Sequence, residues 1–316
     1  TMYYIGVDLG GTNIAVGIVN ENGDLLRKGS VPTGADREPD LIIKDMAELC
    51  RKLVAEEGLQ VSDIEYAGIA TPGTADSDTG IVVYANNLPF LNYPLAAKLK
   101  EFLGVKKVLI ENDANVAAKG EAACGAAKGF KDSVMITLGT GLGGGIVIDN
   151  KVYSGFNHAG AELGHIVIDL NGKPCSCGRK GCWEAYSSAT GLINMTKEKL
   201  ASVKDTVMHE MVEKEGKVSG RTAFDAMRKG DKAAKEVVDE YIYDLAMGIT
   251  NIINIFQPEV LVIGGGICNE KNYLLDPLNA IVSTEQYTRN NKVKTELRIA
   301  KLGNDAGIIG AAMLGL

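Results

Sequence analysis

The sequence predicts an α/β protein, and three observations support that prediction. Short apolar stretches of strand composition alternate with longer stretches whose apolar residues recur at helical spacing. Glycine-rich turns follow several of the apolar stretches and mark where strands end. The chain has 316 residues, 46% of them apolar and 23% charged. It therefore has enough material for one large domain or two ordinary ones.

The first 58 residues predict three strands and a helix. Residues 3–19, YYIGVDLGGTNIAVGIV, read as strand, glycine turn, strand. The pair Asn22-Gly23 predicts a hairpin turn before a third strand over 25–31. The following helix is expected between Pro39 and Gly58, because apolar residues recur there at helical spacing. Those residues are Ile42, Met46, Leu49, Cys50 and Leu53.

The middle of the chain continues the alternation. A strand is expected over 64–70, and another over 108–110 leads into Glu111-Asn112-Asp113 and an alanine-rich helix to about 127. Residues 134–149 repeat the opening pattern, because a shift of 129 positions places VDLGGTNIAVGIV on ITLGTGLGGGIVI without a gap. This repeat predicts two related lobes, each with a glycine turn. Chance similarity between two glycine-rich hairpins is the alternative.

The C-terminal third is mainly helical by its pattern. Residues 197–235 predict charged helix, and 241–256 predict an amphipathic helix that Pro258 stops. A buried strand over 260–263 runs into Gly264-Gly265-Gly266. A final helix rich in alanine and glycine is expected to start near Asp305.

Composition excludes several classes of protein. A net charge of −7 argues against a protein built mainly to bind nucleic acid. No stretch predicts a signal peptide or a membrane span. Six cysteines in a chain of this length do not indicate a disulfide framework. We therefore expect a cytoplasmic protein with no nucleic-acid or membrane partner.

Three glycine-rich turns each follow an apolar strand, and they predict a phosphate site. Such turns let consecutive N–H groups point at phosphate oxygens with no Cβ in the way. Thr12 and Thr140 add hydroxyl donors, and Asp8 is placed to hold Mg²⁺ directly or through water. The alternative is that the turns are only tight turns. They contain Gly10-Gly11, Gly139-Thr140-Gly141 and Gly264-Gly265-Gly266.

Two other phosphate motifs are not supported. Residues 139–144 match G-x-G-x-x-G, but a dinucleotide fingerprint opens a helix, whereas this segment continues as the apolar strand pattern 145–148. A Walker A loop is absent, because neither Gly-Lys pair is followed by Ser or Thr.

Asp113 follows a buried strand and opens a helix, so two roles are open to it. Aspartate is a favoured N-cap residue. A carboxylate at this position could also orient an attacking hydroxyl and take its proton late in a phosphoryl transfer, which depends mainly on alignment and charge neutralisation. Sequence position does not separate these roles.

A second candidate site lies between residues 157 and 184. Its spacing predicts a closed tetrahedral zinc site of structural type, formed by His165, Cys175, Cys177 and Cys182. Gly178 and Gly181 provide sharp turns, and the alternative is three buried thiols. The other cysteines, Cys50, Cys124 and Cys268, are predicted in the core. His158 is expected to contact a substrate or to make a structural hydrogen bond.

These motifs together resemble the ROK family of bacterial sugar kinases and sugar-responsive repressors, and the resemblance runs from end to end. Asp8-Leu-Gly-Gly-Thr12 is similar to the first phosphate turn of the family. Residues 165–184 match its G-H-x9-C-x-C-G-x2-G-C-x-E signature from the histidine onward, with Gly164 before it. The segments 111–115 and 138–145 are typical as well.

The resemblance implies an actin-like (ribonuclease H-like) ATPase fold, with two lobes and the sugar in the cleft between them. The expected small lobe is 1–113 plus 303–316, and the large lobe is 114–302 with the zinc knuckle. Asp113 matches the catalytic base. The matching sugar positions are Gly73, Asn87, Asn112, Asp113, Glu162, His165 and Glu184. The matching ATP positions are Asp8, Gly10, Gly11, Thr12, Asn13, Gly139, Thr140, Gly141, Gly264, Gly265 and Gly266.

The expected function is that of an ATP-dependent hexose kinase, with glucose as the leading substrate, Mg²⁺ bound with ATP and Zn²⁺ structural. Kinases of fructose, N-acetylglucosamine, N-acetylmannosamine or allose, and a non-catalytic sugar-binding regulator, are the alternatives. Repressors of the family carry a DNA-binding helix-turn-helix before the first phosphate turn, whereas Asp8 lies near the start of this sequence, so we expect an enzyme. Family members are commonly homodimers or homotetramers. Many members have Trp at Phe90 and Lys at Asn13, which leaves phosphate contacts at Asn13 open.

Overall fold

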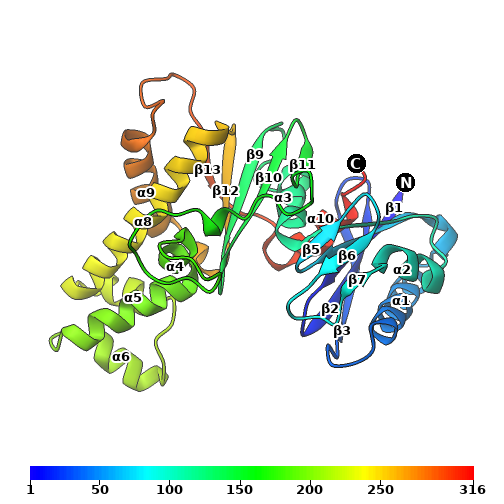
Figure 1. Cartoon of the computed structure of the whole chain (residues 1–316), viewed down its shortest axis with the longest axis horizontal. Coiled ribbons are helices and arrows are strands. Elements are labelled where there is room, and N and C mark those ends of the chain that lie inside the picture. The colour runs from blue at the N-terminus through cyan, green and yellow to red at the C-terminus, as the bar shows by residue number, and fades with distance from the viewer. The chain divides into compact units, whose positions relative to one another are not determined.

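The computed structural model describes residues 1–316 as an α/β structure with mixed sheets, as the sequence predicts (Figure 1). The chain forms two compact units. Unit 1 comprises 1–133, 145–161 and 301–316, and unit 2 comprises 134–144 and 162–300. Residues 114–133, 145–161 and 301–302, expected in the large lobe, lie in unit 1 of this division. The helix that begins at Asp113 packs there on the C-terminal helix and also contacts the strand over 151–153. The functional lobe boundaries themselves stay a prediction.

The main sheet of unit 1 has five strands in the order β3-β2-β1-β4-β8. β1 pairs antiparallel with β2 and parallel with β4, while β2–β3 is antiparallel and β4–β8 is parallel. The strands are β1 (Tyr3–Leu9), β2 (Asn13–Asn20), β3 (Leu25–Pro32), β4 (Ile64–Thr71) and β8 (Val108–Asn112). A small second sheet contains β5 (Thr74–Asp76), β6 (Ile81–Tyr84) and β7 (Leu91–Tyr93).

Helices cover both faces of the main sheet. Alternate residues of β1, such as Ile5 and Val7, are buried with residues of α1 (Pro39–Glu56) and α2 (Leu95–Leu103). The opposite face packs on α10 (Ala306–Ala312) so closely that a Cβ on Gly6 would lie 1.9 Å from the Ile308 carbonyl oxygen. Helix α3 (Asp113–Cys124) packs on α10. The missing side chain at Gly6 thus lets α10 pack directly on β1, the strand that carries Asp8.

The second five-stranded sheet has the matching order β11-β10-β9-β12-β13. β10–β11 is antiparallel and β12–β13 is parallel, as their counterparts are in the first sheet. β1 ends at Leu9 and β9 at Leu138, while β2 begins at Asn13 and β10 at Leu142, so both boundaries keep the offset of 129. The strands are β9 (Ser133–Leu138), β10 (Leu142–Ile148), β11 (Lys151–Tyr153), β12 (Val260–Gly264) and β13 (Glu296–Ile299). The internal repeat predicted from the sequence is therefore present in the fold.

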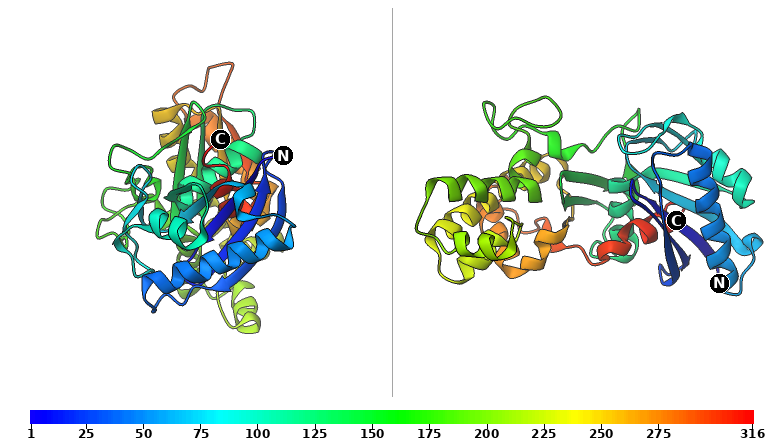
Figure 2. Two further views of the ribbon diagram at one scale, coloured as in Figure 1. Left: turned by 90° about the vertical axis from the view of Figure 1, so that its right-hand side faces the viewer. Right: turned by 90° about the horizontal axis from the view of Figure 1, so that it is seen from below.

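The helices of unit 2 gather around α8 (Lys232–Phe256), which contacts α4, α5, α7 and α9 (Figures 1 and 2). Trp183 of α4 is fully buried, and a Cβ on Gly248 of α8 would lie 1.9 Å from its ring. The absent side chain at Gly248 therefore seats α4 on α8. The helices are α4 (Trp183–Ser187), α5 (Ala189–Ser202), α6 (Met208–Glu215), α7 (Thr222–Arg228) and α9 (Asn272–Glu285). Short 3-10 helices cover η1 (Val61–Asp63), η2 (Leu163–His165), η3 (Gly266–Glu270) and η4 (Gly303–Asp305).

The predicted strands are confirmed, and α8 begins at Lys232 rather than near Tyr241 because Asp231 caps it there. The sequence did not predict the three strands of the small sheet, nor the strands β11 and β13 and the helices α2, α4 and α9. Two of the three remaining cysteines, Cys50 and Cys268, are buried as predicted, but Cys124 is only half-buried, with its Sγ beside Gly23. None of the helices combines the length and apolar character that crossing a membrane requires.

Candidate functional site

The structure separates the two roles left open for Asp113. Asn112 is the N-cap of α3, because its Oδ1 accepts hydrogen bonds from the N–H groups of Ala114, at 3.0 Å, and Asn115, at 3.4 Å. Asp113 is the first residue of the helix and is exposed, although its own Oδ1 also accepts from Ala114 N–H at 2.8 Å. Desolvation by the surrounding protein raises the pKa of the Asp113 carboxyl. Asp113 is thus not needed as the cap, and it is a better base than a free aspartate.

Asp8, at the end of β1, is the second acid of unit 1. Burial raises the pKa of the Asp8 carboxyl, and the negative charge of Asp113 raises it further. No protein group donates a hydrogen bond to Asp8, and a Cβ on Gly307 of α10 would lie 2.5 Å from its Oδ2. A half-buried carboxylate without a protein donor fits the role of a Mg²⁺ ligand, direct or through water.

Gly73 and Asn112 form one connected part of the predicted sugar site. The side-chain amide of Asn112 donates to the Gly73 carbonyl at 2.9 Å, so the turn after β4 is fixed to the start of α3. Gly73 has a φ of 84°, and a Cβ there would lie 2.0 Å from the Tyr84 carbonyl oxygen, so the position requires glycine. Asn87 is exposed, and its Cβ would be 3.2 Å from a Cβ on Gly11. Asn87 therefore adjoins the first glycine turn.

Glu111 is a positioning residue that the sequence reasoning did not single out. Its Oε1 accepts from Asn112 N–H at 2.8 Å and from the Asn115 side-chain amide at 3.0 Å. Burial raises the pKa of the Glu111 carboxyl, and these hydrogen bonds oppose that shift. The i,i+4 pair Glu111–Asn115 across the start of a helix was the signal available in the sequence.

The glycine turn of unit 1 is closed by its own backbone and by a threonine. Gly10 N–H donates to the Asn13 carbonyl at 3.0 Å, and Thr33 Oγ1 donates to the Gly10 carbonyl at 2.6 Å. Thr33 is fully buried, which fixes that contact. Thr12 and Asn13 are exposed at the tip. Thr12 and Asn13, which are predicted to contact phosphate, thus lie exposed on a turn that hydrogen bonds hold in place.

The two turns of unit 2 lie beside each other. Gly139 N–H donates to the Gly141 carbonyl at 3.0 Å, while Gly265, with a φ of 103°, would place a Cβ 2.2 Å from the Leu138 carbonyl oxygen. A Cβ on Gly266 would meet nothing within 4 Å. The neighbouring strand therefore crowds Gly265, whereas the space beside Gly266 is open. This fits a phosphate cradle built from main-chain groups.

The four predicted zinc ligands converge. His165 Nδ1 lies 3.6 Å from Cys175 Sγ, and Cys177 Sγ lies 3.6 Å from Cys182 Sγ. All four ligand atoms lie within 4.8 Å of one another. Zinc–ligand bonds of about 2.0–2.3 Å in a tetrahedron put ligand atoms roughly 3.4–3.8 Å apart. The donor set and its spacing therefore fit Zn²⁺, with no ligand position left open.

The knuckle places the two predicted sugar carboxylates of unit 2. Glu162 directly precedes η2, which ends at His165, and its side chain makes no capping hydrogen bond. Glu184 lies in the first turn of α4, two residues after Cys182, and its Oε2 accepts from Leu142 N–H at 2.8 Å. Because His165 turns Nδ1 toward Cys175, its other ring nitrogen is available to a ligand.

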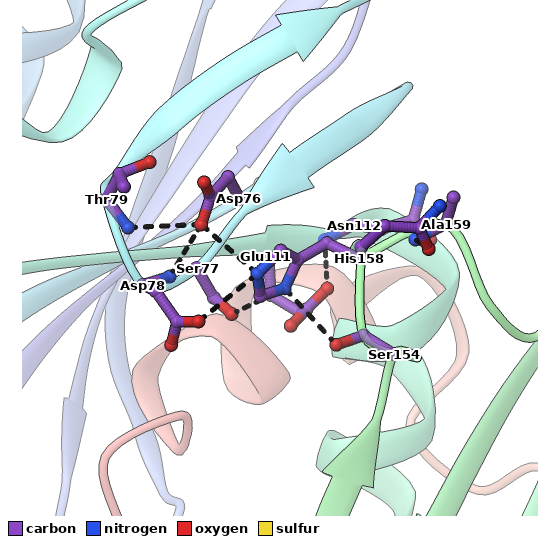
Figure 3. A network of polar contacts seen from close by, with 10 residues as sticks. Asp76, Ser77, Asp78, Thr79, Glu111, Asn112, Ser154, His158 and Ala159 are labelled. Carbon is purple, nitrogen blue, oxygen red and sulfur yellow. Dashed lines mark hydrogen bonds and ion pairs between the residues drawn. The ribbon is translucent and has the colours of Figure 1, made fainter.

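His158 makes structural contacts, one of the two outcomes expected for it. Its Nε2 lies 3.2 Å from Asp76 Oδ1 and 3.3 Å from Asp78 Oδ2, and its Nδ1 lies 3.3 Å from Ser77 Oγ and 3.4 Å from Ser154 Oγ (Figure 3). These contacts join the segment after β11 to the turn between β5 and β6. The same view shows Glu111 near the histidine ring.

Two surface cavities contain none of the predicted site residues. A cavity of about 850 Å³ lies between β3 and α1, where its charged walls are paired with each other, as in Arg37–Asp45 at 2.7 Å. A smaller one of about 230 Å³ lies beside Lys119 and Asn150. Neither of these two cavities therefore corresponds to the candidate site.

The sequence pattern of the ROK family matches residues 4–316. A glucokinase of Halalkalibacterium halodurans is 37% identical over 99% of this chain and 94% of its own length, and one of Thermotoga maritima is 38% identical over 98% and 96%. The crystal structure of a ROK family glucokinase from Streptomyces griseus in complex with glucose and AMPPNP superposes with a TM-score of 0.78, at 32% identity, covering 99% of this chain and 98% of that one. The chain therefore belongs to the ROK family.

Proposed function

We propose that the chain is an ATP-dependent hexose kinase, with glucose as its leading substrate and glucose 6-phosphate as the product. The observation that carries the proposal is the state of Asp113. It stands at the exposed start of α3 with a raised pKa, while Asn112 performs the capping. The relatives named glucokinase and the similar structure that holds glucose and AMPPNP support both the reaction and the leading sugar.

In the proposed reaction, Asp113 aligns the 6-hydroxyl of the sugar and accepts its proton. The hydroxyl oxygen forms a bond to the γ-phosphorus as the bond from that phosphorus to the β,γ-bridging oxygen breaks, and ADP leaves. Little covalent work falls to the protein, since alignment and charge neutralisation dominate phosphoryl transfer. A raised pKa suits a base that must take the proton late and later release it.

We assign the remaining polar groups by their chemistry. Carboxylates accept from vicinal sugar hydroxyls, while asparagine amides both donate and accept. The proposed sugar contacts are Gly73, Asn87, Asn112 and Asp113 in unit 1 and Glu162, His165 and Glu184 in unit 2. The proposed ATP contacts are Asp8, Gly10, Gly11, Thr12 and Asn13 in unit 1 and Gly139, Thr140, Gly141, Gly264, Gly265 and Gly266 in unit 2.

Two metal ions complete the proposal. Asp8 would hold Mg²⁺, which neutralises phosphate charge when it is bound with ATP. His165, Cys175, Cys177 and Cys182 would hold a structural Zn²⁺ that fixes the orientation of the His165 ring and of α4. None of the six cysteines forms a disulfide, which supports the cytoplasm as the proposed compartment. A homodimer or homotetramer is the expected assembly.

ADP release from a panel of hexoses tests both the reaction and the substrate. Glucose, fructose, N-acetylglucosamine, N-acetylmannosamine and allose are compared at equal concentration with Mg²⁺ and ATP. We expect the highest kcat/KM with glucose, and a loss of kcat of about 10²–10⁴-fold in Asp113→Asn. Asp36→Asn, a carboxylate outside the predicted site, is the matched control.

The pattern of failure identifies the alternatives. A different preferred sugar would reassign the substrate and keep the kinase. Sugar binding by a folded protein without ADP release from any hexose would instead favour the non-catalytic regulator.

A further inference from the structure

Glu184 is hydrogen bonded to the glycine turn that we assign to ATP. Its Oε2 accepts from Leu142 N–H at 2.8 Å, directly after Gly141. A Cβ on Gly141 would lie 2.4 Å from the same oxygen, so the turn and the carboxylate are in van der Waals contact. A residue proposed to bind sugar therefore also supports a nucleotide turn.

The same helical junction holds the other end of this turn. Ala189 N–H, at the start of α5, donates to the Gly139 carbonyl at 2.9 Å. The turn is thus bonded at both ends, Gly139 and Leu142, to the short segment between Glu184 and Ala189. Trp183, fully buried against Gly248, fixes this segment in unit 2. A movement of Glu184 would accordingly change the position of the turn.

Glu184 keeps one oxygen for a ligand. Its Oε2 is occupied by Leu142 N–H, whereas Oε1 lies 3.9 Å from Cys175 Sγ, beyond a strong hydrogen bond. A sugar hydroxyl donating to Oε1 would restrict the rotation of the carboxylate, and that restriction would stabilise the bond from Leu142. Because binding free energies are linked, nucleotide on the turn would favour sugar on Glu184 by the same factor.

We propose that Glu184 is a positioning residue for the ATP turn 139–142 and thereby couples sugar binding to nucleotide binding. The coupling to sugar rests on the proposed function, while the positioning of the turn does not. Glu162 provides the contrast. It is the other sugar carboxylate proposed in unit 2, and no hydrogen bond joins its side chain to the turn.

The first experiment measures the Kd of Mg²⁺-AMPPNP by calorimetry without sugar. We expect Glu184→Ala to weaken binding at least fivefold, although Glu184 would not touch the nucleotide. Glu184→Gln, whose side-chain oxygen can still accept from Leu142, should stay within twofold of the wild type. Glu162→Ala, the matched carboxylate, should leave this Kd unchanged. An unchanged Kd in a folded Glu184→Ala variant would overturn the inference, whatever the sugar results are.

The second experiment approaches the contact from the turn. Gly141→Ala pushes on Glu184, so the Kd for glucose without nucleotide should rise at least threefold. Gly139→Ala is the matched control, because its Cβ would meet nothing closer than 4.0 Å, and its glucose Kd should be unchanged. Equal glucose affinities in the two variants would refute the coupling. A wild type that releases no ADP with any hexose would refute the proposed function, and the AMPPNP series would still decide the role of Glu184.

Discussion

The two hairpins related by the shift of 129 positions share a backbone and differ in side chains. In β1–β2 the strand carries Asp8, which the aligned hairpin β9–β10 replaces with Thr137. The charge of Asp113 raises the pKa of the Asp8 carboxyl. The turn at Gly139–Gly141 is instead followed by Leu142, whose N–H donates a hydrogen bond to Glu184. The repeat therefore retains the glycine turn in both copies. The first turn follows a strand that carries a carboxylate of its own, whereas the second is hydrogen bonded to a carboxylate from another element.

The largest effect expected within the two hairpins tests whether a catalytically important carboxylate belongs to the first hairpin alone. We expect Asp8→Asn to lower kcat by about 10²–10³-fold, because it removes the carboxylate proposed to hold Mg²⁺ at the transferring phosphate. Thr137→Val, at the matching position of the second hairpin, should change kcat less than threefold. Steady-state rates at saturating Mg²⁺ and ATP provide the measurement. Equal losses in both variants would contradict the assignment of a special charge role to Asp8.

The next effect concerns the candidate zinc site formed by His165, Cys175, Cys177 and Cys182. This site is close in sequence to Glu184, which is hydrogen bonded to the second hairpin. Wild-type protein should contain about one zinc per chain by elemental analysis, since the donor set is complete. Cys177→Ser should lower the zinc content and weaken glucose binding about 10–100-fold. Cys124→Ser, a thiol outside the knuckle, is the control and should retain the metal. If glucose affinity survives metal loss, the knuckle only stabilises the fold.

A smaller effect is expected on the thermal stability of Asp113→Asn. This variant should be more stable than the wild type at neutral pH, although it is less active. Folding raises the carboxyl pKa of Asp113, so the folded state binds its proton more tightly than the unfolded state does. The contribution of Asp113 to stability is therefore lost as pH rises from the ordinary aspartate pKa through the raised one. Asp113→Asn should raise Tm at pH 7, and the gain should shrink as pH falls toward 4. A lower Tm at pH 7 would contradict this account.

Much of the fold could be predicted because its signals are local. Glycine turns, Pro39, Pro258 and the apolar periodicity of α1 and α8 each determine their own segment. The strands β5, β6 and β7 were missed because they are three or four residues long and become strands only by pairing with one another. The start of α8 was missed because a capping aspartate outweighs the apolar pattern that begins later.

The candidate site divides in the same way. The cluster of His165 with three cysteines was predictable, because these four side chains lie within 18 residues of sequence. The capping role of Asn112 could not be separated from that of Asp113, because adjacent residues differ only in which of them has helical backbone angles. The bond from Leu142 to Glu184 joins positions 42 apart, and no local pattern reports it.

The smallest expected effect concerns His158, in the segment that follows β11. The two copies of the repeat diverge after their third strands. β3 leads toward α1, whereas β11 leads into residues 154–161, which His158 joins to the β5–β6 turn. His158 itself has a φ of 59°, so the contacts with Asp76 and Ser154 must offset a backbone conformation that is unfavourable outside glycine. His158→Ala should therefore lower the free energy of unfolding by about 1 kcal/mol. Because Glu162 follows this segment, the KM for glucose should rise a few-fold while kcat stays unchanged.

The pH dependence of the Tm of His158→Ala tests whether the loss of stability comes from the pairing of His158 with Asp76. A side-chain hydrogen bond from Thr79 chiefly lowers the pKa of Asp76, and the charge of His158 lowers it further. A depressed carboxyl pKa contributes stability above the unfolded value, and that stability is lost as pH falls through the folded one. The Tm difference between wild type and His158→Ala should therefore narrow below pH 4, as measured by thermal melts, with Ser154→Ala showing a smaller difference throughout. A difference that stays constant down to pH 3 would mean that the histidine acts through packing and that its pairing with Asp76 contributes nothing.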